Sequence, residues 1–298
     1  MRSRVRVRST DDETALPPRS LMPPVAARVV TKVLLVAVAL YFVFPLVWML
    51  FSVTKTDSQL ATTSAFWFGP ENHVVENFRT LDATTNGMFL RWVANSIFYA
   101  VASALGGTLI GVMAGYAIAK FRFPGRNLAL GVITASMLLP TGILTVPLVS
   151  WFHTLGIVNT IWAVIVPGLV STIGVFLGMI YVNSSVPDEL IEAARIDGAG
   201  EYRIFFTMVL RILAPALVTI FLFMFVGSWN NFLLPLMMIS DTDLMPVSLG
   251  LYGLISALNT SRPAVVLGAV IGVVPLIVLF FSLQKYWRAG LTAGAVKM

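Results

Sequence analysis

The sequence predicts an all-α membrane protein with six transmembrane helices and both termini in the cytoplasm. Its 298 residues are 57% hydrophobic and only 11% charged, whereas soluble proteins average about 25% charged residues. So few charges cannot cover a soluble domain, and a disordered chain would combine low hydrophobicity with high charge. Two further observations, long uncharged runs and a one-sided distribution of basic residues, indicate the number and orientation of the helices.

Five runs contain no Asp, Glu, Lys or Arg, and they cover residues 33–54, 92–119, 127–187, 212–240 and 263–284. A helix of about 20 apolar residues crosses a bilayer core of about 30 Å, so each shorter run holds one span and the longest holds two. The expected spans are 32–52, 92–118, 128–150, 157–182, 211–239 and 264–284. A polar break at Ser150, His153, Gly156 and Asn159 divides the longest run into a tight hairpin.

Lysine and arginine residues lie mainly in alternate connections. The N-terminal arm, the second-to-third connection, the fourth-to-fifth connection and the tail together hold 16 of the 20. The opposite side holds only Lys55, Arg79, Arg91 and Arg262. Because cytoplasmic segments are enriched in basic residues, both termini are predicted to be cytoplasmic. The pI near 9.8 then reflects charges spread along one membrane face, which argues against a nucleic-acid partner.

Three regions are expected along the chain. Residues 1–28 combine alternating arginines, an acidic run and two proline pairs, which predicts a disordered cytoplasmic N-terminal arm. Residues 29–289 form the six-helix transmembrane domain, and residues 290–298 form a cytoplasmic tail. No convincing small-residue cleavage site follows Ser52, so the first apolar run is interpreted as a retained span and not as a cleaved signal peptide.

The interiors of the predicted spans hold no charged side chain. Charged residues inside a membrane usually mark proton or ion pathways, so a proton-coupled carrier is disfavoured. Glycines recur at four-residue spacing on single helix faces: Gly107, Gly111 and Gly115 in the second span, Gly174 and Gly178 in the fourth, and Gly268 and Gly272 in the sixth. Such faces let helix backbones approach closely, and packing within one bundle or between subunits is the expected role.

A few polar and aromatic side chains within the spans are candidates for lining a pathway. They are Asn95 in the second span and Trp229, Asn230 and Asn231 in the fifth. Amides can bond sugar hydroxyls and a tryptophan can stack on a sugar ring. Hydrogen bonds between helices and anchoring at the membrane interface are the commoner roles of these residue types.

Signatures of catalysis and of nucleotide binding are missing from the sequence. It has no cysteine and only two histidines, His73 and His153, which excludes a disulfide framework and a thiolate metal site and argues against a zinc cluster. No Gly-x-x-x-x-Gly-Lys-Ser/Thr phosphate loop occurs. We therefore predict no catalytic residue, no metal and no cofactor in this chain. A partner must supply the energy for any active transport.

A short amphipathic helix is predicted between the fourth and fifth spans. Pro187 suits its first position, Asp188 and Glu189 complement the positive helix end, and Gly198 is well suited to end it. A second helix is expected to start near Glu201.

The apolar face of this short helix is a stripe of Leu190, Ala193 and Ala194, at i, i+3 and i+4. Because the helix is too short to span a membrane, this face is predicted to dock against a partner. The alternative is packing on the membrane surface or on the chain's own bundle.

Here the sequence resembles a known family. Glu192, Ala193 and Ala194, followed by Gly198 and Leu210, are similar to the EAA loop of the membrane subunits of ATP-binding-cassette importers. Asp197, Phe205 and Pro215 also match the carbohydrate branch. The chain departs from the family pattern at Arg211, where a proline usually follows the leucine. The loop spans residues 187–215, and the resemblance implies that it contains a coupling helix that sits in a cleft of the ATPase subunit.

The resemblance covers nearly the whole chain after the N-terminal arm. Asn95-Ser96, the segments 121–125 and 229–232, and the ending 290–297 are similar to MalG-type sugar permeases. The resemblance implies partners: a second, MalF-like permease, two ATPase subunits that bind ATP and Mg, and an extracytoplasmic sugar-binding protein. It also implies a multi-pass location in a bacterial or archaeal plasma membrane, surrounded by lipid.

Two more segments gain an expected role from the resemblance. The tail is expected to contact the ATPase dimer through Leu291, Thr292, Gly294 and Lys297, with a frayed terminus as the alternative. The last outer loop, Asp241 to Arg262, matches the segment that reaches toward the binding protein in MalG-like permeases.

The predicted function is therefore a permease subunit of an importer for a mono-, di- or oligosaccharide. The alternative is a secondary carrier or a channel for a small polar solute. A carrier would be expected to show intramembrane ionisable residues or an internal repeat, and neither is clear. A membrane-embedded enzyme would need a nucleophile, acid/base or metal constellation, and the two histidines have no charged partner nearby in sequence.

Overall fold

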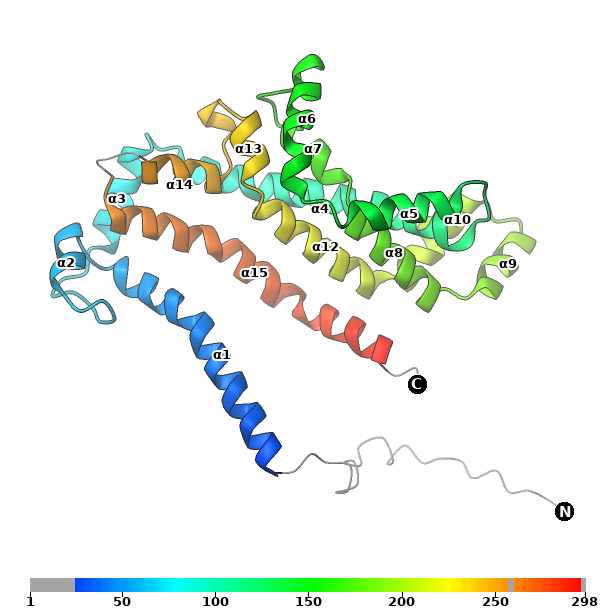
Figure 1. Ribbon diagram of the computed structural model, residues 1–298, viewed down its shortest axis with the longest axis horizontal. Helices are drawn as coiled ribbons and strands as arrows, with labels where there is room; N and C mark the ends of the chain where they lie inside the picture. Colours follow the sequence, from blue (N-terminus) through cyan, green and yellow to red (C-terminus); the bar gives the residue numbers. More distant parts are fainter. Residues whose placement is uncertain (1–24, 257–259, 296–298) are drawn as a thin grey trace.

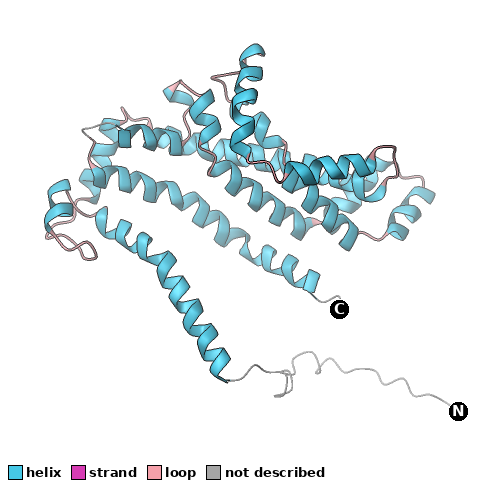
Figure 2. Cartoon of the chain, viewed as in Figure 1, coloured by secondary structure: helices cyan, strands magenta, loops and turns pink. Residues whose placement is uncertain are grey.

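The computed structural model describes residues 25–256 and 260–295, and within these ranges every regular element is helical (Figure 2). Four helical segments are long and apolar enough to cross a membrane: Val25–Ser52, Phe89–Lys120, Trp162–Ser185 and Arg262–Tyr286. A bent helix pair, Glu201–Ile212 with Ala214–Trp229, gives a fifth when it is counted as one span. The all-α membrane fold is thus confirmed, whereas the described residues do not contain six continuous spans.

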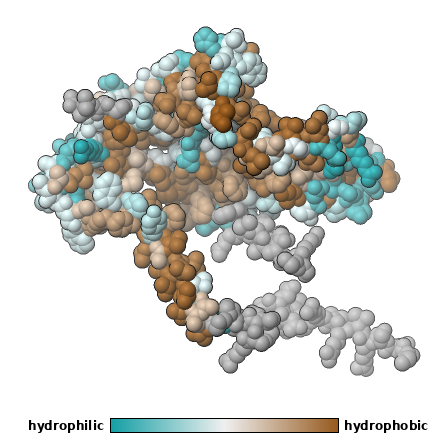
Figure 3. Space-filling view, in the orientation of Figure 1, coloured by the Kyte–Doolittle hydropathy of each residue, from teal (hydrophilic) through white to brown (hydrophobic). Residues whose placement is uncertain are grey.

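Three of the expected spans are continuous helices. They are α1 (Val25–Ser52), α4 (Phe89–Lys120) and α15 (Arg262–Ala295). Helix α1 begins four residues before the predicted boundary of the N-terminal arm, and residues 1–24 of that arm lie outside the described ranges. Apolar side chains cover the outside of α1, where Tyr41 is 76% exposed. Hydrophobic residues likewise cover much of the face seen in Figure 3.

The expected continuous span over residues 128–150 is wrong. The chain forms α5 (Arg126–Ser136) and then α6 (Thr141–Thr154), which leaves the direction of α5 (Figure 1). Pro140 lies in the break and has an extended backbone. The first helix ends before this position because proline lacks an N–H and disfavours a helical backbone in the residue before it. Helix α5 packs on α8 (Thr172–Ser185), whereas α6 packs on α13 (Leu233–Met238).

The fourth and fifth expected spans are also interrupted. Helix α7 (Trp162–Leu169) is separated from α8 by an extended turn, and the Ser171 hydroxyl caps α8 by accepting from the Gly174 N–H at 3.0 Å. Three residues, 230–232, separate α12 (Ala214–Trp229) from α13. The predicted single helix over 211–239 is therefore wrong, and the expected amphipathic helix and its successor appear as α9 (Asp188–Ile196) and α10 (Glu201–Ile204).

A turn of π-helix, Phe205–Val209, and the short α11 (Leu210–Ile212) connect α10 to α12. The chain bends by 84° between α11 and α12. Arg211, where the family pattern has a proline, lies directly before this bend. Pro215 lies in the first turn of α12, where its missing N–H costs no intrahelical hydrogen bond.

Helix α4 lies at the centre of the packed bundle, with α8 and α12 against it. A β-carbon added to Gly111 would lie 2.9 Å from the backbone of Gly174, and one added to Gly178 would lie 3.0 Å from the α-carbon of Val112. The glycine faces of the second and fourth spans therefore pack against each other within this chain, in agreement with the sequence-based expectation.

The connecting segments gather at two opposite ends of the bundle. Helices α2 (Asp57–Thr62), α3 (Val74–Thr84) and α14 (Val247–Ser256) lie at one end, and α9 and α10 lie at the other (Figure 1). At the first end, the backbone N–H of Arg262 donates to Asp57 at 3.0 Å. This end holds the four basic residues of the basic-poor side.

Candidate functional site

Helix α9 begins one residue after the predicted first position, Pro187, and ends before Gly198 as its sequence predicts. Pro187 precedes it with an extended backbone, and Asp188 and Glu189 occupy its first turn. Gly198 follows its end with φ of +82°, a left-handed conformation that costs glycine little and other residues more. The helix therefore starts and stops through local chemistry.

The two faces of α9 have different surroundings. Ile191 and Ala194 are buried against the rest of the chain, being 3% and 7% exposed. Ala193 is exposed on the opposite side, and Ile196 is 86% exposed. The expected stripe of Leu190, Ala193 and Ala194 is therefore divided, because Ala194 packs internally while the other two residues face outward. We name Leu190, Ala193 and Ile196 the outward face of α9.

A lysine at the end of α4 holds the start of α9. The Lys120 ammonium donates to the carbonyl of Val186 at 2.7 Å and to the Asp188 carboxylate at 2.5 Å. Its side chain is 7% exposed, whereas that of Asp188 is 74% exposed. The hydrogen bond from Lys120 holds the pKa of Asp188 below its ordinary value. The position of α9 is thus linked directly to the central helix.

A second set of contacts joins the end of α9 to α10 and α4. The Glu201 carboxylate accepts from Arg195 Nε at 2.6 Å and from the Tyr116 hydroxyl at 3.2 Å. The Arg195 guanidinium lies 5.7 Å from the centre of the Phe121 ring, close enough for a cation–π contact. The hydrogen bond to Glu201 raises the pKa of Arg195. We name Tyr116, Arg195 and Glu201 the relay.

The predicted coupling residues divide into exposed and buried members. Glu192, Ala193, Asp197 and Gly198 are exposed on or after α9. Ala194 is buried, and Phe205 is 4% exposed with its ring centre 5.5 Å from that of Tyr116. The first group is available to a partner, whereas the second holds the loop on the bundle.

The predicted tail contacts lie at the end of α15. The helix continues to Ala295, so Leu291, Thr292 and Gly294 belong to its last turns. Lys297 lies outside the described residues. The predicted tail over 290–298 is thus helical in its first part.

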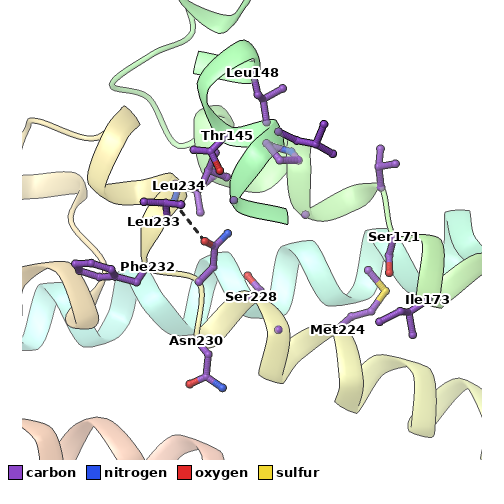
Figure 4. A pocket seen from close by; sticks show the side chains of 18 of the residues that line it. Thr145, Leu148, Ser171, Ile173, Met224, Ser228, Asn230, Phe232, Leu233 and Leu234 are labelled. Carbon is purple, nitrogen blue, oxygen red and sulfur yellow. Dashed lines mark hydrogen bonds between the residues drawn. The ribbon is translucent and has the colours of Figure 1, made fainter. Parts of the chain in front are cut away.

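A second candidate site is a cavity of about 710 Å³ among α6, α7, α12 and α13 (Figure 4). Two helix interruptions meet on it, because Val170 and Ser171 between α7 and α8 and Asn230 to Phe232 between α12 and α13 belong to its wall. Its polar side chains are Thr145, Ser171, Ser228, Asn230 and Asn231. No lining residue is charged, and the remaining lining is apolar or glycine.

The structure separates the four predicted pathway residues. Asn230 and Asn231 line the cavity, and Asn231 Oδ1 accepts from the Leu234 N–H at 3.4 Å (Figure 4). Trp229 is buried and stacks on Phe225 with a centroid distance of 5.7 Å. Asn95 donates to the carbonyls of Asp243 and Met245 at 2.8 and 3.0 Å. Trp229 and Asn95 therefore have structural roles here.

The anchoring of residues 242–247 on α4 was not predicted from the sequence. Trp92 Nε1 donates to the Thr242 carbonyl at 2.8 Å, and the Tyr99 hydroxyl donates to the Leu244 carbonyl at 2.9 Å. The Ser96 hydroxyl accepts from the Val247 N–H at 2.8 Å. Together with Asn95, these side chains fall at i, i+3, i+4 and i+7. That spacing was the available signal for one helix face with a hydrogen-bonding role.

Within the described ranges, no group of three or more metal-ligating His, Cys, Asp or Glu side chains comes together. The cavity and the outward face of α9 are therefore the candidate functional features within these ranges.

Comparison with known proteins shows the family of this chain. Residues 107–292 match the family model described as binding-protein-dependent transport system inner membrane component. The chain is 33% identical over 261 residues to the arabinooligosaccharides transport system permease protein AraQ of Halalkalibacterium halodurans, covering 87% of this chain and 93% of that protein.

Two further comparisons agree with this match. The sn-glycerol-3-phosphate transport system permease protein UgpE of Escherichia coli (strain K12) is 29% identical over 254 residues, which is 83% of this chain and 90% of that protein. A solved structure of a bacterial ABC transporter involved in the import of the acidic polysaccharide alginate contains a chain with the same fold. The TM-score is 0.76 at 23% identity, over 92% of this chain and 100% of that chain.

Proposed function

This chain belongs to the family of binding-protein-dependent transport system inner membrane components, and from that premise we propose that it is the permease subunit of an ATP-driven importer for a carbohydrate. The relatives named above are permease proteins, one of them for arabinooligosaccharides. The observation that carries the proposal is the outward face of α9. It leaves an apolar surface at one end of the bundle, where an ATPase subunit can bind.

The proposed assembly contains a second permease, two ATPase subunits and an extracytoplasmic binding protein. The contacts of Lys120 and of the relay fix α9 to α4, so a force on α9 is transmitted to the helix at the centre of the bundle. ATP-driven closure of the ATPases would thus move the bundle as a rigid body between inward- and outward-facing states. This chain binds no nucleotide in the proposal, because its sequence lacks a phosphate loop.

The cavity supports an uncharged solute. Hydroxyls and amides at Thr145, Ser171, Ser228, Asn230 and Asn231 can exchange hydrogen bonds with sugar hydroxyls, while the apolar wall contacts C–H surfaces. A phosphate or carboxylate would find no cation among the lining residues. Among the relatives' substrates, we therefore favour a neutral oligosaccharide over an anionic solute such as glycerol phosphate.

The decisive experiment places a charge on the outward face of α9. In the importer assembled with its cognate partners in proteoliposomes, Ile196→Asp is expected to abolish most sugar uptake and to reduce co-purification of the ATPase, because an unpaired carboxylate is costly in an apolar interface. Glu192→Lys, on an exposed position of the same helix, is expected to lower uptake too. Asp82→Asn, on α3 at the opposite end, is the control.

Two results would contradict the proposal. Normal uptake by correctly inserted Ile196→Asp would remove the coupling role of α9. ATP-independent uptake by this chain alone in proteoliposomes would favour a secondary carrier or channel. The proposal also expects that the purified chain alone hydrolyses no ATP.

A further inference from the structure

A second cavity, of about 600 Å³, lies between α9 and the connection from α4 to α5. Six of its lining side chains are charged: Lys120, Arg122, Arg126, Asp188, Glu192 and Arg195. Four are cations and two are carboxylates, so the formal charge of the lining is +2. We name this cavity the basic groove. The coupling role of α9 does not account for this excess of positive charge.

The cations of the basic groove differ in how they are used. Lys120 is paired with Asp188, and Arg195 is paired with Glu201. Within the described ranges, neither Arg122 nor Arg126 forms an ion pair. Arg126 donates through Nε to the Ile118 carbonyl at 2.7 Å, which orients its guanidinium and leaves the terminal nitrogens available. Arg122 and the terminal nitrogens of Arg126 can therefore contact an anion, with the carboxylates of Asp188 and Glu192 in the same lining.

The groove continues into an apolar surface. Arg122 and Arg126 also line a smaller cavity of about 260 Å³ together with Phe123 and Leu128. Phe123 is 40% exposed, Leu128 is 73% exposed, and Val132 one turn further along α5 is 60% exposed. Residues four apart lie on one helix face. Arg122 and Arg126 therefore lie at one end of an exposed apolar strip along α5.

We propose that the basic groove binds the phosphodiester of an anionic phospholipid, with an acyl chain along Leu128 and Val132. Arginine guanidinium groups match phosphate oxygens with two parallel hydrogen bonds. A headgroup held by cations beside a lipid-facing apolar strip is the arrangement expected at the membrane interface. The inference rests on the membrane orientation in the proposed function, which places this end at the cytoplasmic leaflet.

The geometry favours a lipid over the ATPase as occupant. Ile191 lines the basic groove and Ala193 belongs to the outward face. At 100° per residue these two positions are about 200° apart around α9. Most of the groove therefore faces away from Ala193, and the two surfaces adjoin at Glu192, which lines the groove and lies one turn before Ile196. A lipid in the basic groove would contact α9 on the side of Ile191, while the ATPase binds the outward face.

The test measures retained lipid and not transport. The assembled importer is placed in nanodiscs of phosphatidylcholine with about one fifth phosphatidylglycerol, extracted in mild detergent, and analysed by native mass spectrometry. The wild type is expected to retain phosphatidylglycerol. Arg122→Gln is expected to bind it at least about tenfold more weakly, because one charge-assisted contact is lost. Arg122→Lys, which keeps the charge without the planar fork, is expected to lie between the two.

Arg203→Gln is the matched control, since Arg203 is exposed on α10 at the same end and lies outside the groove. Equal retention by Arg122→Gln and Arg203→Gln, with equal thermal midpoints, would overturn the proposal. Loss of the ATPase from Arg122→Gln without loss of lipid would assign the groove to the ATPase. Arg122-dependent binding of inorganic phosphate without lipid retention would assign it to a free anion. Lipid retention is measured without sugar or ATP, so the result stands apart from any failure of transport.

Discussion

Glu201 shows how single side chains link the short helices α9 and α10 to the bundle. It accepts one hydrogen bond from Arg195, which lies six positions earlier on α9, and one from Tyr116, which lies 85 positions earlier on α4. Tyr116 is 5% exposed, and its ring also packs near Phe205. Because the carboxylate has two donors, the relay joins three helices at one point.

Removing one hydroxyl tests the relay. Tyr116→Phe keeps the ring packing but deletes the hydrogen bond to Glu201. We expect the free energy of unfolding to fall by about 1 kcal/mol, because Glu201 is partly exposed and solvent weakens the contact. We expect sugar uptake per ATP hydrolysed to fall severalfold in the assembled importer. Tyr202→Phe is the matched control, because Tyr202 is 79% exposed. Equal coupling ratios for the two variants would show that the hydroxyl does not transmit force.

At the scale of elements, the contact between α4 and α8 depends on the absence of side chains. A β-carbon at Gly115 would lie 2.5 Å from the backbone nitrogen of Met179, and Gly111 and Gly178 are similarly crowded by backbone. Backbone cannot move aside as the end of a flexible side chain can. The two helices therefore pack at close range only while these positions remain glycine.

Gly178→Val is expected to push α8 away from α4. Overpacking typically costs about 1–3 kcal/mol, and we expect a lower thermal midpoint and a lower yield of assembled importer. Gly131→Val on α5 is the control, since no atom lies within 4 Å of a β-carbon built at Gly131. The packing argument fails if both variants have the same midpoint, as measured by fluorescence-detected size exclusion after heating.

At the scale of the whole molecule, the basic residues divide between the two ends of the bundle. Lys120, Arg122, Arg126 and Arg195 gather around α9. Arg91 and Arg262 lie at the end that holds α2, where Arg91 pairs with Asp243 at 3.4 Å. The basic residues, which lie mainly in alternate connections along the sequence, thus give the two ends of the bundle unequal charge. By the positive-inside rule, the end with α9 should face the cytoplasm.

Single cysteines test this orientation cleanly, because the chain has none of its own. In intact cells, a membrane-impermeant maleimide is expected to label Ala83→Cys on α3 and to spare Ile196→Cys on α9 until the membrane is permeabilised. Both positions are exposed. The reverse labelling pattern would invert the proposed topology.

Local sequence signals were enough to predict the membrane class, the three continuous spans, the limits of α9 to within one residue and the small-residue packing faces. These features depend on local hydrophobicity, helix periodicity and end signals, which a stretch of 10 to 30 residues carries. The tertiary structure was needed to show that α5 and α6, on either side of Pro140, pack on different helices, that two helix interruptions meet at one cavity, and that Ala194 packs inward while Ala193 faces outward. Each of these depends on contacts between distant segments. The hydrogen bond from Trp92 to the Thr242 carbonyl, 150 positions apart, is another contact of this kind. A hydropathy profile cannot predict such contacts, because it considers each residue only with its neighbours in sequence and not with its neighbours in space.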